Sequence, residues 1–183
     1  QVWAKENIIE QWTEIKHSEI EAVLLQKFAS ANLYFTNKDF YLTSFQGEYL
    51  KEMQPVESKL LQGIRTIDSK MGIRAMLLQT PNFILSFGKP ASENQGTVMM
   101  GQLAWSGNFK MDYEIDSYKN LRLIAGINPF ASEYSLQPNQ VFKTPALLYA
   151  LSNNGTGEAS RNLHDWARKY RLLDGQGERL TLL

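Results

Sequence analysis

Three acidic side chains alternate along one candidate strand, an arrangement in which neighbouring carboxylates can work together. Asp112, Glu114 and Asp116 occupy every second position, so adjacent members lie about 7 Å apart on one face of an extended chain. A carboxylate pair can supply a general acid and a general base. No aromatic platform for a substrate accompanies these residues, and we therefore interpret them as a solvated sheet face.

One tryptophan and one asparagine flank a Ser-Gly pair and are the best candidates for a ligand contact. Trp105 precedes Ser106 and Gly107, and Asn108 follows them. An indole face can stack on the apolar face of a pyranose ring, while an asparagine amide both donates to and accepts from hydroxyl groups. A core tryptophan beside a turn is the simpler interpretation of Trp105, so a binding role for this pair stays a hypothesis.

Thiol and metal chemistry are excluded by what the chain lacks. It contains no cysteine, and its two histidines, His17 and His164, are far apart in sequence. A zinc site built from histidine and cysteine is therefore excluded, and we expect no metal and no cofactor. His164 stands next to the apolar Leu163, which favours packing or a hydrogen bond over catalysis.

Composition indicates an ordinary globular domain. The 183 residues are 43% hydrophobic and 21% charged, enough to bury a substantial core. Lys+Arg and Asp+Glu both number 19, for a formal net charge of zero, so no nucleic-acid partner is expected. No apolar run approaches the roughly 20 residues that span a bilayer, and no membrane partner is expected either.

Turn residues divide most of the chain into short candidate strands. Asparagine, aspartate, glycine and proline recur between apolar runs, and these residues supply the positive φ, fixed φ or local capping that turns require. Ten strands are predicted: 8–16, 20–35, 40–45, 58–68, 76–78, 83–87, 97–106, 109–116, 121–127 and 141–151. Their regular spacing predicts a mainly β fold, a large antiparallel β-sandwich.

Strict alternation marks the segment 109–116, where odd positions are apolar and even positions charged. One face of this strand should therefore be buried and the other solvated. With 106–108 as the turn, the segments 99–106 and 109–116 are predicted to form an antiparallel hairpin.

A single helix is predicted near the C-terminus, from about 158 to 171. Ala159, Leu163, Ala167 and Tyr170 fall on one stripe, with Trp166 at its margin. We expect residues 1–152 to form the sandwich, and residues 153–183 to form a connector helix and the start of a link. The absence of an initial methionine and the β-prone end 178–183 suggest a piece of a larger protein.

Four blocks of the sequence, in order, resemble the N-terminal β-sandwich of family 36 glycoside hydrolases. The blocks are Ser106-Gly107-Asn108, Gly126-Ile127-Asn128-Pro129-Phe130, Leu136-Gln137-Pro138 with Phe142-Lys143-Thr144-Pro145, and Leu163-His164. The resemblance implies a supersandwich of the galactose-mutarotase type followed by one connector helix. The family consists mostly of α-galactosidases, in which this sandwich precedes the catalytic barrel.

The resemblance also implies where the chemistry lies. The family's aspartate nucleophile and aspartate acid/base belong to the barrel, beyond Leu183, so this fragment alone is expected to be inactive. We expect it to support its own barrel, to act on α-galactoside oligosaccharides through the full enzyme, and to join a homo-oligomer. A soluble bacterial protein of the cytoplasm or periplasm is expected.

One segment departs from the family pattern. Where many members have a Ser-Ser-His-like run after a glycine, this chain has Gly72-Ile73-Arg74-Ala75-Met76. Arg74 can reach a ligand or a barrel loop, although a surface or interface arginine is the simpler interpretation. Arg74 therefore joins Trp105 and Asn108 as a candidate substrate-binding residue.

Two other functions remain open. A stand-alone carbohydrate-binding sandwich without hydrolase activity would use Trp105 as its platform, and the isolated chain would bind a sugar. A purely structural adhesion or scaffold role would need an exposed edge or apolar patch, on which the sequence gives no evidence.

Overall fold

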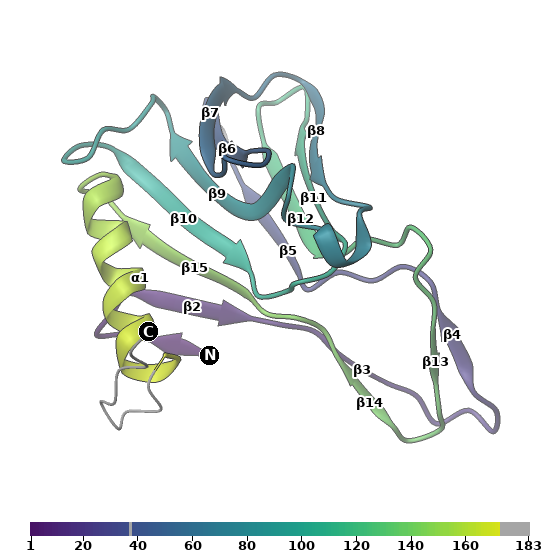
Figure 1. Cartoon of the computed structure of the whole chain (residues 1–183). Helices are drawn as coiled ribbons and strands as arrows, with labels where there is room; N and C mark the ends of the chain where they lie inside the picture. Colours follow the sequence, from purple (N-terminus) through teal and green to yellow (C-terminus); the bar gives the residue numbers. More distant parts are fainter. Residues whose placement is uncertain (37, 173–183) are drawn as a thin grey trace.

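Two unequal antiparallel sheets face each other in the computed structural model, which describes residues 1–36 and 38–172; a helix covers one outer face and an arm extends from one end (Figure 1). The larger sheet contains, in order, β1 (Val2–Trp3), β2 (Ile8–Gln11), β15 (Leu147–Ser152), β10 (Thr97–Leu103), β9 (Gln79–Phe87), β6 (Phe40–Gln46) and β7 (Gln54–Lys59). The smaller sheet contains β5 (Ala31–Phe35), β12 (Leu121–Ile127), β11 (Phe109–Ile115) and β8 (Gly63–Asp68). The predicted β-sandwich is confirmed.

The main core lies between the two sheets, because each strand turns alternate residues inward. On β11, Phe109, Met111 and Tyr113 are fully buried, as the alternation of this segment predicts. Tyr113 meets Phe83 of the larger sheet with ring centroids 6.0 Å apart and an edge-on geometry. Burial raises the pKa of the Tyr113 hydroxyl well above its ordinary value, so this tyrosine is a neutral core residue.

The predicted hairpin between 99–106 and 109–116 is wrong. Strand β10 pairs with β9 and β15, whereas β11 pairs with β12 and β8. Residues 104–108 therefore cross from the larger sheet to the smaller one. A turn signal between two alternating strands is compatible with either arrangement, because both strands bury one face against the same core.

Four predicted strands, 8–16, 20–35, 58–68 and 141–151, are each broken in two, and the predicted strand 76–78 is absent. The segment 58–68 contains the end of β7 and all of β8, which belong to different sheets. Gly63, with φ of +120°, permits the change of direction between them, since this backbone region favours glycine. The segment 76–78 lies instead in turns after a short 3₁₀ helix, η1 (Gly72–Arg74).

The arm consists of two ribbons that leave the sandwich together (Figure 1). Strand β3 (Glu14–Lys16) pairs with β14 (Val141–Lys143), and β4 (Val23–Leu25) pairs with β13 (Tyr134–Leu136). Phe142 joins the ribbons, with its ring centroid 4.8 Å from that of Phe28 and 4.6 Å from that of Tyr134. At the base of the arm, Thr144 Oγ1 accepts a hydrogen bond from the Thr13 amide at 2.9 Å.

The predicted helix is confirmed as α1 (Thr156–Tyr170), and it packs on the outer face of β15, β10 and β2. Ala159 and Trp166 are buried there in a second apolar cluster. Trp166, predicted at the margin of the stripe, meets Trp3 edge-on at 6.2 Å between ring centroids. Gly155 is the N-cap residue of this helix and makes no side-chain hydrogen bond there.

Carboxylates at both ends hold α1 to the sandwich. Glu158, in the first turn, accepts hydrogen bonds from Ser152 and Asn154, and these lower the pKa of its carboxyl group. Near the other end, Lys169 Nζ pairs with Glu6 at 3.0 Å, and Arg171 pairs with Glu10. The hydrogen bond from Lys169 lowers the pKa of Glu6. Within the described residues, α1 is thus part of the domain's own packing.

Candidate functional site

The crossing segment 104–108 folds its tryptophan back onto itself. Trp105 Nε1 donates a hydrogen bond to the carbonyl oxygen of Asn108 at 3.1 Å. This position of the indole requires Gly107, because a Cβ there would lie 2.8 Å from Trp105 Nε1. The Trp105 side chain remains 37% exposed. The structure therefore presents an indole held at the surface by its own loop, and not a core tryptophan.

Asn108 connects this loop to the segment that contains Arg74. Its side-chain Oδ1 accepts a hydrogen bond from the Gly72 amide at 2.7 Å, and Gly72 opens η1. Its main-chain oxygen accepts from Trp105 Nε1 and from the Asn128 amide, the latter at 3.0 Å. The amide oxygen of Asn108 is thus used within the protein, and only its Nδ2 group has no partner in the described structure.

Asn128, the asparagine of the Gly-Ile-Asn-Pro-Phe block, holds the same segment from the other side. It is 2% exposed. Its Nδ2 group donates to the carbonyl oxygens of Ser69 at 3.0 Å and Phe109 at 3.3 Å, and its Oδ1 accepts from the Phe130 amide at 3.0 Å. A buried amide with all these bonds fixes backbone that has no regular partner strand. Asn108 and Asn128 therefore position residues 69–74.

Arg74 lies at the open end of this loop cluster. It is exposed, and its guanidinium has no ion-pair or hydrogen-bond partner among the residues that the structure describes. Together with Tyr49, Met76, Leu77 and Ser106 it lines an open cavity of about 730 Å³. The structure thus brings the three predicted residues, Trp105, Asn108 and Arg74, to one end of the sandwich.

The loop between β6 and β7 supplies a residue that the sequence prediction missed. Tyr49 is 80% exposed, and the neighbouring Leu50 and Met53 have positive φ of 65° and 56°. Non-glycine residues are uncommon in this backbone region and cluster at functional loops. The Gly47 amide donates to the Leu78 carbonyl at 2.9 Å, which joins this loop to the Arg74 segment. No turn-forming glycine marks Leu50 or Met53, so the sequence contained no signal for this geometry.

The acidic residues of β11 are not a catalytic pair. Asp112 is bound by Lys110 Nζ at 2.6 Å and Thr66 Oγ1 at 2.7 Å, and Glu114 pairs with Arg122. Asp116 instead closes the turn after β11, where hydrogen bonds from Asn120 lower the pKa of its carboxyl group. Asp112 and Glu114 thus lie on the outer face of β11 as interpreted, whereas Asp116 lies in the turn after the strand.

The two histidines lie apart, as their sequence positions suggest. His17 Nε2 is 2.8 Å from the Leu136 carbonyl in the arm, whereas His164 is on an exposed flank of α1. The described part of the chain contains no group of three or more histidine, cysteine, aspartate or glutamate side chains that could bind a metal ion. None of the described helices is both long and apolar enough to cross a membrane.

The fold and this site define a β-sandwich in which the loops around Arg74 present an arginine and aromatic side chains. The chain belongs to glycosyl hydrolase family 36: residues 1–137 match the N-terminal domain of that family. The predicted family is therefore confirmed.

Similar proteins are α-galactosidases. The chain is 28% identical over 181 residues to α-galactosidase 2 of Pediococcus pentosaceus. The aligned region covers 96% of this chain but only 24% of that enzyme. The crystal structure of the α-galactosidase AgaA from Geobacillus stearothermophilus superposes with a TM-score of 0.83 at 28% identity, over 89% of this chain and 22% of that one. A variant of AgaA in complex with stachyose gives a TM-score of 0.80 at 27% identity, over 88% of this chain and 22% of that one.

Proposed function

We propose that this chain is the N-terminal sandwich of an α-galactosidase that retains anomeric configuration, with its two catalytic aspartates in a barrel beyond residue 183. In this proposal residues 1–152 form the sandwich and 153–183 the connector to the barrel; residues 173–183 lie outside the described structure. The observation that supports it most directly is that a match over 96% of this chain covers only 24% of α-galactosidase 2 of Pediococcus pentosaceus. Retention needs two carboxyl groups about 5 Å apart, and the acids of β11 are instead engaged in ion pairs and a turn.

The loop end is proposed to form part of the wall of the galactoside site in the assembled enzyme. Arg74 offers a guanidinium with no partner in the described structure, and Tyr49 an exposed ring beside it. Hydroxyl-rich ligands are recognised by such donors together with an aromatic face. Stachyose, the ligand of the AgaA variant, is an α-galactoside oligosaccharide, and we propose the same substrate class here.

Trp105 and Asn108 take a supporting part in this proposal. The indole nitrogen and the Asn108 amide oxygen are already used to shape the loop, so their contribution is to hold Arg74 in place. The indole face and the Asn108 Nδ2 group remain available to a sugar. A homo-oligomer of the full enzyme is also proposed, because the exposed arm extends far from the core of one copy (Figure 1).

Hydrolysis of an aryl α-galactoside tests the proposal. The full-length protein is expected to release the aryl group, whereas residues 1–183 alone are expected to release none, because the proposal places both catalytic aspartates beyond residue 183. A full-length protein that binds galactose but hydrolyses no α-galactoside would exclude the hydrolase function.

A stand-alone sugar-binding domain is the competing function, and calorimetry distinguishes it. The exposed indole of Trp105 is the feature that favours it. We expect residues 1–183 to give no binding heat with melibiose or raffinose, because one indole face without a partner offers little contact. Binding by the isolated chain that disappears in Trp105→Ala would support the sugar-binding domain instead.

A further inference from the structure

The outer face of the larger sheet is covered on one half only. Helix α1 packs on β2, β15 and β10, while β9, β6 and β7 have no element over them within the described chain (Figure 1). Strands in a sheet are about 4.8 Å apart, so the three uncovered strands span about 10 Å from first to last. An α-helix with its side chains is about 10 Å across. The free half of the face thus has the width of one more helix.

A groove runs between α1 and this free half. Its volume is about 440 Å³. One wall is a flank of the helix formed by Ser160, Leu163, His164 and Ala167, whose spacing places them on one side of α1. Phe45 and Met53 form the opposite wall, and Met53 is 45% exposed. Leu163 and Ala167 on one wall and Phe45 and Met53 on the other make the groove largely apolar, which suits the packing of a neighbouring helix.

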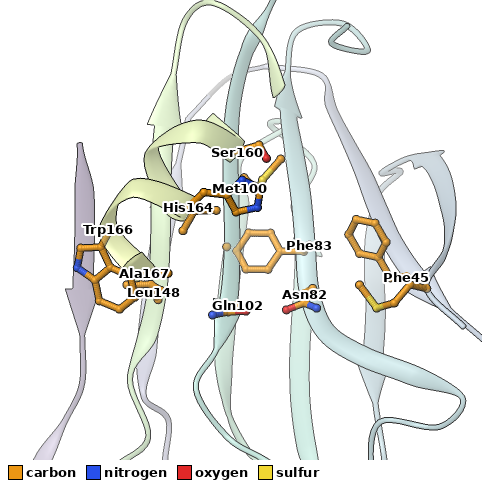
Figure 2. A pocket seen from close by; sticks show the side chains of 13 residues that line it. Phe45, Asn82, Phe83, Met100, Gln102, Leu148, Ser160, His164, Trp166 and Ala167 are labelled. Atoms are coloured by element: carbon orange, nitrogen blue, oxygen red, sulfur yellow. The ribbon is translucent and has the colours of Figure 1, made fainter. Parts of the chain in front are cut away.

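Two amides on the floor of the groove have no partner. Asn82 of β9 and Gln102 of β10 are directly opposite each other in the strand register, and Figure 2 shows them side by side below Met100 and His164. Neither side chain makes a hydrogen bond within the described structure. Gln102 is exposed and Asn82 half-buried. Covering them would bury unpaired amides at a cost, so an element that packs on this floor must bring its own donors and acceptors.

We infer that the groove receives an amphipathic helix from the part of the same polypeptide that follows residue 183. This inference rests on the proposed function, because the relatives are about four times as long as this chain and the chain matches their N-terminal domain. The docking helix packs apolar side chains against Phe45, Met53 and Leu163, and places hydrogen-bonding side chains over Asn82 and Gln102. Helix α1 lies along this face and forms one wall of the site in which the second helix docks.

Photo-crosslinking in the full-length protein tests this inference. The photoreactive amino acid benzoylphenylalanine is placed at Gln102, on the floor, or at Phe45, where one aromatic ring replaces another and the fold is least disturbed. Lys89, an exposed residue of the β9–β10 loop, provides the control position. We expect adducts from Gln102 and Phe45 to one peptide beyond residue 183, with helical spacing of its apolar residues, and no such adduct from Lys89.

Each other outcome overturns the inference. Absence of adducts means that the groove is open, and adducts within residues 1–183 mean that another part of this chain fills it. When light- and heavy-isotope proteins are mixed before irradiation, adducts of mixed mass mean that a second copy is the occupant. Hydrolysis of an aryl α-galactoside is measured on the same samples. An inactive protein with the expected adduct would refute the proposed function and leave the docking inference intact.

Discussion

Two regions of this domain differ in whether their charged side chains are paired. The helix side comprises α1 and the residues that it contacts, and the loop end comprises residues 47–53, 69–78 and 104–108. On the helix side, Lys169 and Arg171 pair with Glu6 and Glu10, whose side chains are only 10% and 11% exposed. At the loop end, hydrogen bonds fix the backbone, and Arg74 has no partner in the described structure. Charged groups that pair within one domain have no free charge to offer a ligand. A cation without a partner on a rigid loop can bind one. The comparison supports a stabilising role for the first region and agrees with the ligand contact that we propose for the second.

The largest effect is expected from removing the helix's main anchor. Trp166→Ala should lower the free energy of unfolding by about 3 kcal/mol, because a large buried side chain is replaced by a cavity. Denaturation followed by circular dichroism measures this. Arg168→Ala is the control: its side chain is 64% exposed and, among the described residues, pairs with Asp165 alone, so we expect less than about 0.5 kcal/mol. Equal effects would show that α1 is not held by its apolar stripe.

A smaller loss of stability is expected at the loop end. Asn128→Ala removes a buried amide and leaves the Ser69 and Phe109 carbonyls without that donor, at a cost of about 2 kcal/mol. Asn94→Ala, at an exposed position with no hydrogen bond in the described structure, should change little. A melting curve for Asn128→Ala that matches Asn94→Ala would show that the asparagine does not hold this end together.

Asn108→Ala should lower the free energy of local opening of residues 69–74 by about 1 kcal/mol, the typical net value of one hydrogen bond. The Gly72 amide loses its acceptor, so residues 69–74 should exchange amide hydrogens faster. The strands of the core should keep their protection. Faster exchange throughout the sandwich would instead mean that Asn108 supports the whole fold.

Acid should weaken the helix side before it affects the loop end. The folded-state pKa values of Glu6 and Glu158 are lowered below 4.5 by Lys169 and Ser152, respectively. Their contribution is therefore present above pH 4.5 and is lost as the pH falls through the lowered values. In thermal melts, the melting temperature should fall between pH 6 and pH 3, and it should fall less steeply in Glu158→Gln than in the wild type. A variant with the same pH dependence as the wild type would contradict this linkage.

Local patterns predicted the elements well and their partners poorly. The alternation of 109–116 identified β11 and its buried face, and the stripe of 159–170 identified α1. The same alternation could not say that β10 and β11 lie in different sheets, because the pattern fixes which face is buried and not which strand is adjacent.

The candidate site was predicted in part for a similar reason. Trp105 and Asn108 were recognisable because they flank a Ser-Gly turn, and Arg74 because its segment departs from the family pattern. These residues meet at one end of the sandwich through contacts between distant parts of the sequence, such as the hydrogen bond between Asn108 and Gly72, which are 36 residues apart. The strained loop with Tyr49 contains ordinary residues at its positive-φ positions, and only tertiary structure reveals it.

The specificity constant kcat/KM of the full-length protein for raffinose tests the central claim most directly. If the loop end forms part of the galactoside site, Arg74→Ala should lower kcat/KM by about 10-fold or more, the loss expected for a charged hydrogen bond to substrate. Lys89→Ala removes an exposed cation from the opposite end of the sandwich and should leave kcat/KM unchanged. An Arg74→Ala enzyme as active as Lys89→Ala would contradict the account and reduce this domain to a support.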